Sequence, residues 1–323
     1  MNKNPAQKEK YLFGPVHSRR LGLSLGVDIV PLKACTLNCV YCQLGRTVKT
    51  TIERREYVPV SLVLSELKDR IDKGLKADYI TISGSGEPTL NSSLGSLIYG
   101  IKKITEIPVA VLTNGTLFNR IDIRQDCSAA DVVLPSLDAA DELTFQKINR
   151  PHPSINVKNL ISGLIAFRGE FTGEIWLEVF IIDGINTDFL QLTAIKNAIE
   201  LIRPDKIQLN TAVRPTAEEG IKKANLQKLN EIAAFLGPAC EVIADFSQKH
   251  HRPEAPQAVN LTCSEGLAES VFSILKRRPC SLNHISEGLS ISKEQAQVCI
   301  EYLQKQGLIT TQITNNTHFF SSK

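Results

Sequence analysis

Between residues 25 and 210 the chain alternates short apolar, β-branched runs with amphipathic helical segments, and this alternation restricts the folds it can adopt. Strands separated by helices are parallel and are joined by right-handed crossovers. The pattern therefore predicts an α/β fold, either an open doubly wound sheet or an incomplete (β/α)6 barrel. The strand-like runs are Leu25–Val30, Tyr79–Ser83, Val109–Thr113, Val132–Leu137, Ile175–Ile182 and Lys206–Leu209, and the helix-like segments are Ser61–Leu75, Leu94–Ile104, Ile155–Arg168 and Phe189–Ile202.

The C-terminal part has a different pattern and is predicted to be a separate small domain. A polar stretch with Pro253 and Pro256 precedes it and is typical of a linker. We expect a main domain over residues 1–250, a linker over 251–260 and a small domain over 261–323. The small domain should contain helices Gly266–Lys276, Leu282–Leu289 and Ser292–Gln304, then a hairpin of Leu308–Ile313 and Thr317–Phe320 across Asn315-Asn316.

Three helices and a hairpin in this order resemble a winged helix. The presumed recognition helix carries Glu294 and Glu301 but only one lysine, Lys293. A DNA reader should present a basic face. The charge pattern therefore favours a protein-docking or substrate-capping module over a DNA-binding one.

The composition is that of an ordinary soluble globular chain, with 42% hydrophobic and 22% charged residues. A formal net charge of +3 is too small to indicate nucleic-acid binding by itself. The chain has no apolar run of about 18 residues, so no membrane span is expected. The polar stretch Met1–Lys10 does not resemble a signal peptide. We expect a cytoplasmic protein.

Three of the eight cysteines form a compact motif. Cys35, Cys39 and Cys42 have the spacing Cys-x3-Cys-x2-Cys, and Tyr41 directly precedes the last of them. Three thiolates can bind three irons of a [4Fe–4S] cluster, which normally takes four protein ligands, so one iron stays open. The alternative is a structural zinc site with His17 as fourth ligand. Zinc ligands usually come as two Cys-x2-Cys pairs, which disfavours zinc.

The other five cysteines are scattered without ligand spacing. Single buried thiols are common in protein cores, and a reducing compartment keeps them free. We therefore expect structural thiols at Cys127, Cys240, Cys263, Cys280 and Cys299.

Polar residues and glycines gather where the predicted strands end. The active site of a parallel barrel lies at the carboxyl ends of its strands, and glycines let the backbone approach a ligand closely. The segments are Ser83–Thr89 after the second strand, Thr113–Gly115 after the third, Ser136–Asp138 after the fourth, Glu178 within the fifth and Gln208–Pro215 at the end of the sixth.

Each of these segments also has a local interpretation. Ser83–Thr89 and Asn114-Gly115 are compatible with simple turns, and Asp138 with a helix cap. Glu178 lies in an apolar strand, so it should be paired or face the barrel interior. Arg214 has the chemistry to grip a carboxylate or a phosphate.

The cysteine spacing, with its aromatic residue before the third cysteine, resembles the signature of the radical S-adenosylmethionine (SAM) superfamily. Ser83–Thr89 resembles the Gly-Gly-Glu-Pro element of that superfamily, with Ser85 in place of the first glycine. This resemblance implies a partial (β/α)6 TIM-type barrel in which Cys35, Cys39 and Cys42 bind a [4Fe–4S] cluster. The open iron would chelate SAM, and an electron would cleave it to methionine and a 5′-deoxyadenosyl radical that abstracts hydrogen from a substrate.

The same resemblance implies contacts to SAM. The candidate SAM-binding residues are Tyr41, Gly84, Gly86, Glu87, Asn114, Ser136, Asp138 and Asn210. It also implies an electron donor such as flavodoxin or ferredoxin.

The stretch Phe13–Gly26, together with Lys33 and Gln208–Pro215, resembles a group related to the wyosine-forming tRNA enzymes. That tRNA branch places additional cysteines ahead of the SAM cluster for a second cluster, and here no cysteine precedes Cys35. Only the SAM chemistry is therefore carried over. A tRNA or other RNA is the first substrate class and a protein the second.

Two compact basic groups are Arg19-Arg20 and Lys249–Arg252. They suit a phosphate-bearing substrate and equally suit solvated surface charges. Two further functions stay open. One is a redox-sensing regulator whose cluster gates a DNA-binding winged helix, and the other is an activase that places a radical on a glycyl enzyme.

Overall fold

The structure is a computed structural model that describes residues 11–244, 263–314 and 317–323. The predicted linker 251–260, the basic group Lys249–Arg252, the Asn315-Asn316 turn and the N-terminal peptide Met1–Lys10 lie outside these residues.

Eight strands form one sheet in which the spatial order repeats the order along the chain. Strands β2 to β8 are parallel, and β1 pairs antiparallel with β2. A doubly wound sheet reverses its strand order at a switch point, so the sequential order confirms the partial barrel. The strands are β1 (Leu12–Ser18), β2 (Gly22–Val27), β3 (Tyr79–Ile82), β4 (Val109–Leu112), β5 (Val132–Leu134), β6 (Glu174–Ile181), β7 (Lys206–Thr211) and β8 (Cys240–Val242).

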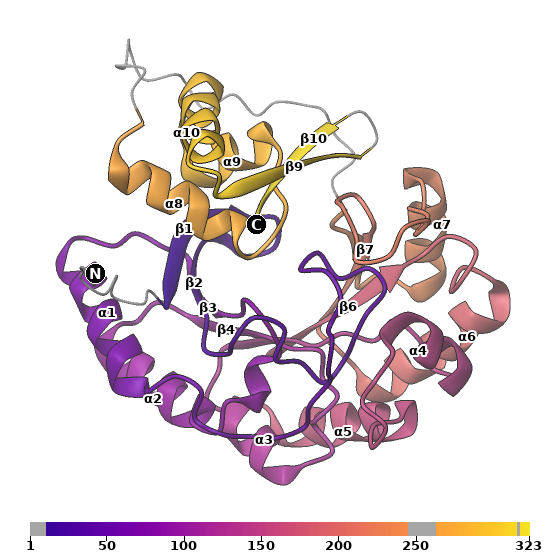
Figure 1. Cartoon of the computed structure of the whole chain (residues 1–323). Coiled ribbons are helices and arrows are strands. Elements are labelled where there is room, and N and C mark those ends of the chain that lie inside the picture. The colour runs from indigo at the N-terminus through magenta and orange to yellow at the C-terminus, as the bar shows by residue number, and fades with distance from the viewer. Residues whose placement is uncertain (1–10, 245–262, 315–316) are drawn as a thin grey trace.

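In the described part of the chain, seven helices cover the outer face of the curved sheet (Figure 1). They bury apolar stripes of helical spacing, such as Leu94, Leu97, Ile98 and Ile101 of α2. The helices are α1 (Val60–Asp72), α2 (Leu94–Ile104), α3 (Ile121–Cys127), α4 (Glu142–Asn149), α5 (Val157–Glu170), α6 (Phe189–Ile202) and α7 (Leu226–Leu236). The short helices α3 and α4, and also α7, were not among the predicted segments.

The two faces of each strand differ in chemistry. Residues such as Leu25 and Ile80 belong to the main apolar core beneath the helices. Alternate residues point to the other side, where the hydroxyls of Ser24 and Thr81 form a buried hydrogen bond of 2.6 Å. The barrel interior is therefore partly polar, as a ligand site requires.

Strand β1 corrects the prediction that the sheet begins at Leu25–Val30. The first parallel strand is Gly22–Val27, and β1 precedes it. Gly14 and Pro15 weaken the strand pattern of this stretch, and the ladder accommodates them with an irregular register between Phe13 and Val16. The short edge strand β8 was also not predicted.

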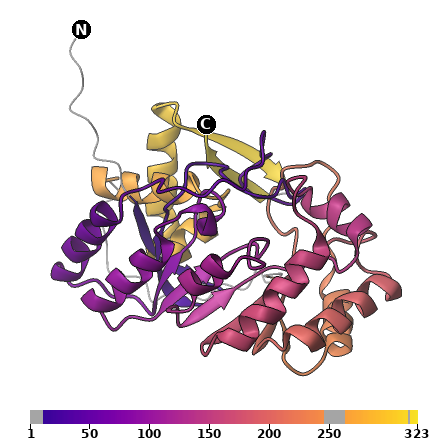
Figure 2. The same ribbon diagram turned by 90° about the horizontal axis from the view of Figure 1, so that it is seen from below.

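The C-terminal residues form a second, smaller unit on the open side of the sheet, opposite the helical layer, and both views agree on this (Figures 1 and 2). Its buried residues make a separate core, which Val16 of β1 joins. The winged-helix assignment and the domain boundaries stay predictions. The elements are α8 (Glu265–Leu275), α9 (Leu282–Leu289), α10 (Lys293–Lys305) and the antiparallel pair β9 (Ile309–Thr314) and β10 (Thr317–Ser322).

One prediction about the cysteines is wrong. Cys263 and Cys299 form a disulfide with their Cα atoms 5.1 Å apart, although 36 residues separate them. Cys263 lies two residues before the start of α8 and Cys299 lies within α10, and the packing of these two helices brings the sulfurs together. The thiols of Cys127, Cys240 and Cys280 are free, as expected. Within the described residues no helix is long and apolar enough to cross a membrane.

Candidate active site

The three cysteines lie on an irregular loop that follows β2 and therefore projects from the carboxyl edge of the sheet. Backbone hydrogen bonds attach this cysteine loop (residues 31–48) to the end of α4, since Val40 N donates to Ile148 O at 2.9 Å and Asn38 N donates to Asn149 O at 3.0 Å. The loop also closes on itself, with Cys42 N donating to Cys39 O at 3.1 Å. The sulfurs are thus held by a structured backbone.

Each of the three sulfurs accepts one N–H hydrogen bond from a different part of the chain. The N–H donors are Asn114 Nδ2 to Cys35 Sγ at 3.6 Å, Asn149 Nδ2 to Cys39 Sγ at 3.5 Å and Lys33 Nζ to Cys42 Sγ at 3.1 Å. Donors of this kind surround the ligands of metal centres and stabilise their charge.

Burial raises the pKa of Cys35 to about 12 and raises the pKa of Cys39 well above its usual value. Buried thiols next to one another favour the neutral form until a metal centre compensates their charge. The donor set, the absence of a disulfide among these three thiols and their shared loop fit an iron–sulfur cluster.

The zinc alternative does not fit. In the described part of the chain no group of three or more His, Cys, Asp and Glu side chains is placed to hold a single metal ion. His17, the proposed fourth ligand, instead shares a 3.2 Å hydrogen bond with Ser290 Oγ. A cluster does not need its ligands to converge on one point, because each thiolate binds a different iron.

The turn that follows β3 packs directly on the cysteine loop. Glu87 N donates to Ala34 O at 2.8 Å, and Lys33 N donates to Ser85 O at 2.7 Å. A Cβ atom added at Gly86 would lie 2.1 Å from the carbonyl oxygen of Ala34. Only glycine therefore allows this approach of the two backbones.

The side chain of Glu87 is fully buried and serves the protein itself. Its Oε1 accepts from Thr113 Oγ1 at 2.6 Å and from Thr89, and its Oε2 accepts from Asn114 N at 2.7 Å. Burial raises the pKa of Glu87, and these hydrogen bonds oppose the shift. Glu87 thus joins the ends of β3 and β4 and orients Asn114.

Gly84 and Ser85 pack against Asp28, a residue that was not among the predicted site residues. Ser85 donates to the Asp28 carboxylate from its N at 3.1 Å and from its Oγ at 2.6 Å. Gly84 has a φ of +131°, and an added Cβ would lie 2.4 Å from the Asp28 carboxyl carbon. Asp28 therefore fixes the position of the turn that follows β3 through its two hydrogen bonds with Ser85.

Tyr41 and Asp138 form a second buried contact at the cysteine loop. The Tyr41 ring stacks on Phe180 with centroids 3.8 Å apart, and its hydroxyl donates to Asp138 Oδ2 at 2.5 Å. Asn149, the donor to Cys39, also donates to Asp138 Oδ2 at 2.7 Å. Burial raises the pKa of Asp138 to about 6, although these hydrogen bonds oppose the shift. The ring of Tyr41 is therefore held in a fixed orientation on the cysteine loop.

Ser136 and Asn210 gather around Glu178 in the barrel interior. Glu178 pairs with Arg20 at 2.7 Å and accepts from Asn210 Nδ2 at 2.9 Å, and Ser136 forms a β-bridge with it. Burial alone would raise the pKa of Glu178, but the charge of Arg20 and the two hydrogen bonds outweigh it and lower the pKa. Glu178 is thus both paired and inward-facing, as expected.

Seven of the eight predicted SAM-binding residues fall into two groups. Tyr41, Gly86, Glu87, Asn114 and Asp138 contact the cysteine loop or lie on it, whereas Ser136 and Asn210 lie around Glu178. Gly84 lies at Asp28. Sequence reasoning missed the sulfur donor Asn149, which lies 110 residues from its partner cysteine and within helix α4, which was not predicted.

The contact between Lys33 and the sulfur of Cys42 leads to a prediction about the reduction potential of the cluster. Its ammonium donates to Cys42 Sγ and to Gly45 O at 2.6 Å. A charged donor stabilises the more negative, reduced form of a cluster. Lys33→Met should lower the cluster's reduction potential by about 60 mV or more, the shift that corresponds to a tenfold change in a one-electron equilibrium.

Redox titration followed by electron paramagnetic resonance measures this potential. Lys49→Met removes an exposed charge from the next segment of chain and serves as the control. Equal potentials in wild type and Lys33→Met would show that the ammonium does not act on the cluster.

The chain matches known proteins over this same region. The family model described as "Radical SAM superfamily" matches residues 29–193. The chain is 38% identical over 227 residues to the UPF0026 protein MJ1312 of Methanocaldococcus jannaschii, covering 69% of this chain and 70% of that protein. Its fold resembles that of a radical SAM methyltransferase from Sphaerobacter thermophilus, with a TM-score of 0.50, 16% identity and coverage of 69% of this chain and 67% of the other.

A further relative is longer than this chain. The protein named GTPase Obg of Brachyspira hyodysenteriae is 36% identical over 308 residues, which cover 95% of this chain and 44% of that protein. The chain therefore spans less than half of that relative. The present sequence contains no Gly-Lys pair and hence no Gly-x4-Gly-Lys-Ser/Thr nucleotide loop, so the name of the relative is not carried over.

The partial barrel and the family match define the class, an enzyme that uses an iron–sulfur cluster and SAM. The chain belongs to the radical SAM superfamily. Among the proteins of that superfamily, it belongs with the UPF0026 proteins. Its cofactors are a [4Fe–4S] cluster and SAM.

Proposed function

We propose that Cys35, Cys39 and Cys42 bind the cluster and that this enzyme abstracts hydrogen from a substrate at the open side of the barrel. When bound, the cluster and SAM supply a 5′-deoxyadenosyl radical. The observation that carries the proposal is the cysteine loop itself, on which three free thiols each accept an N–H hydrogen bond, from Lys33 of the same loop, from Asn114 and from Asn149.

The protein's own residues position the reactants. Gly86 allows the turn after β3 to lie against the cysteine loop, and Glu87 holds Asn114 beside Cys35. Asp138 orients Tyr41, whose ring lines the same site. These residues fix the backbone atoms and side chains that would bind SAM and exclude water, while the cofactor supplies the difficult chemistry.

Anaerobic reconstitution with iron and sulfide, followed by SAM and dithionite, tests the proposal. Wild type should form 5′-deoxyadenosine, and Cys39→Ala should lose both the cluster absorbance and the product. Cys240→Ala removes a thiol far along the chain in β8 and should retain both. Product formation by Cys39→Ala at the wild-type level would remove the cysteine loop from the mechanism.

The proposal extends to the substrate class and the electron donor. The resemblance to the wyosine-forming group makes a tRNA or other RNA the first substrate to test. Membership of the radical SAM superfamily favours a flavodoxin or ferredoxin as the electron donor. A cytoplasmic location agrees with an oxygen-sensitive cluster that needs such a donor. The C-terminal unit lies over the open side of the sheet, which suits a module that caps a substrate (Figure 1).

A further inference from the structure

A small cavity lies where the barrel meets the C-terminal unit. Its volume is about 170 Å³, and three separate segments line it: the end of β1 with the turn that follows, the residues after β7, and the C-terminal residues around α9. Its charged or titratable lining residues are His17, Arg19, Arg214, Arg278, His284 and Glu287.

The described lining of this cavity has an excess of positive charge. Three arginines face one glutamate, Glu287. Burial and then the charges of Arg214, Arg278 and Arg19 lower the pKa of His284 to about 3, so the imidazole stays neutral and the three guanidinium groups all act on one point. Like charges gathered around one cavity favour the binding of an anion there.

Of the three arginines, Arg278 is the one whose guanidinium is best placed to bind a ligand. It is half-buried at the end of α8, and its guanidinium makes no hydrogen bond or ion pair within residues 11–244, 263–314 and 317–323. It lines both this cavity and a second one of about 230 Å³ that reaches Ser83 and Gly84 in the barrel interior. Arg19 lines both as well.

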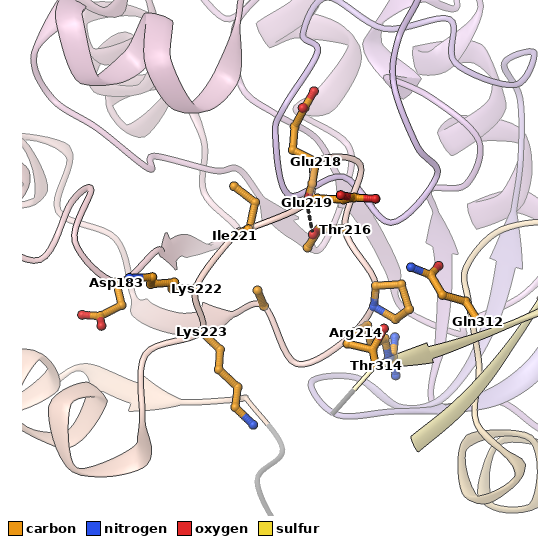
Figure 3. A pocket seen from close by; sticks show the side chains of 13 residues that line it. Asp183, Arg214, Thr216, Glu218, Glu219, Ile221, Lys222, Lys223, Gln312 and Thr314 are labelled. Carbon is orange, nitrogen blue, oxygen red and sulfur yellow. Dashed lines mark hydrogen bonds between the residues drawn. The ribbon is translucent and has the colours of Figure 1, made fainter. Parts of the chain in front are cut away.

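Arg214 connects the small cavity to a larger one and to the cysteine loop. It also lines a cavity of about 640 Å³ between the segment after β7 and strand β9. Figure 3 shows Arg214, Gln312 and Thr314 along one wall of this larger cavity and Lys222 and Lys223 along the other. Arg214 Nη1 donates to Gln43 Oε1 at 3.3 Å, and Gln43 directly follows Cys42.

We infer that Arg19, Arg214 and Arg278 form a binding site for a phosphoryl group of the substrate, whose remaining part occupies the larger cavity. A phosphoryl group carries a charge of about −2 and is attracted by the three guanidinium groups that line the cavity, and the planar guanidinium matches phosphate geometry. The assignment of this group to the substrate rests on the proposed function, because the site adjoins the cluster-binding loop.

Binding of inorganic pyrophosphate to the full, reconstituted chain tests the inference by calorimetry at physiological ionic strength. Wild type should bind saturably, and Arg278→Gln should bind about tenfold or more weakly because a charged hydrogen-bonding partner is lost. Arg278→Lys keeps the charge and should bind with intermediate affinity. Lys305→Gln removes an exposed charge from α10 and should bind like wild type. Equal binding by wild type and Arg278→Gln would overturn the inference.

Competition distinguishes the source of the phosphoryl group. Displacement of pyrophosphate by unfractionated tRNA would assign the site to an RNA phosphate. Saturable pyrophosphate binding that tRNA does not disturb would assign it to a small phosphorylated molecule. If neither probe binds wild type while wild type still cleaves SAM, the phosphoryl site is refuted and the proposed function stands. If SAM is not cleaved, the proposed function fails whatever the binding result.

Discussion

Gly86→Ala should abolish most SAM cleavage, although it adds only one methyl group. The new Cβ would lie 2.1 Å from Ala34 O and 3.1 Å from Val30 Cγ2, and the nearest of these atoms belongs to the backbone just before Cys35. Backbone cannot rotate away as a flexible side chain can, so either the turn after β3 or the cysteine loop must move. Overpacking of this kind costs about 1–3 kcal/mol of folding free energy.

The expected measurements are a SAM affinity at least about tenfold weaker, which corresponds to about 1.4 kcal/mol, and a lower unfolding temperature of the reconstituted protein. Gly169→Ala is the matched control, because Gly169 lies in α5 with no atom within 4 Å of an added Cβ. Alanine there should stabilise the fold by about 0.5–1 kcal/mol and leave SAM binding intact. A Gly86→Ala protein with normal SAM affinity would show that the two loops do not need their close contact.

Arg277→Met should destabilise the protein by about 3–5 kcal/mol, the usual cost of leaving a buried charge without its partner. Arg277 Nε lies 3.1 Å from Asp28 Oδ2, and the two side chains are only 11% and 9% exposed. The guanidinium also stacks on Phe13 of β1 with its Cζ 4.2 Å from the ring centroid. This one residue therefore joins the C-terminal unit to β1 and, through Asp28, to Ser85 in the turn that follows β3.

Denaturant unfolding of Arg277→Met, Asp28→Asn and the double variant measures the coupling. The double variant should lose less free energy than the sum of the two single losses, since neither charge is then left alone. Lys68→Met is the control: its pair with Asp72 is 65% and 59% exposed, so the change should stay below about 0.5 kcal/mol. Strict additivity of the two single effects would contradict a direct Arg277–Asp28 interaction.

Much of the fold was predictable from local patterns. Helices α2 and α6 begin and end at the predicted residues, because their apolar stripes and flanking polar residues lie within one segment. Strand β1 was not predictable, because Gly14 and Pro15 obscure its pattern and only its pairing with β2 makes it a strand. The disulfide between Cys263 and Cys299 likewise depends on two helices packing together.

The candidate site divides in the same way. The spacing of Cys35, Cys39 and Cys42 determined by itself that three thiols share one loop, since neighbours along a short loop stay neighbours in space. Only the tertiary structure decided that Asn149 reaches Cys39 and that Arg277 reaches Asp28 across 249 residues. Such contacts depend on strand register and on how the C-terminal unit packs against β1. No local pattern encodes strand register or the packing of the C-terminal unit. The small cavity lined by Arg19, Arg214 and Arg278 could therefore be found only in the folded chain.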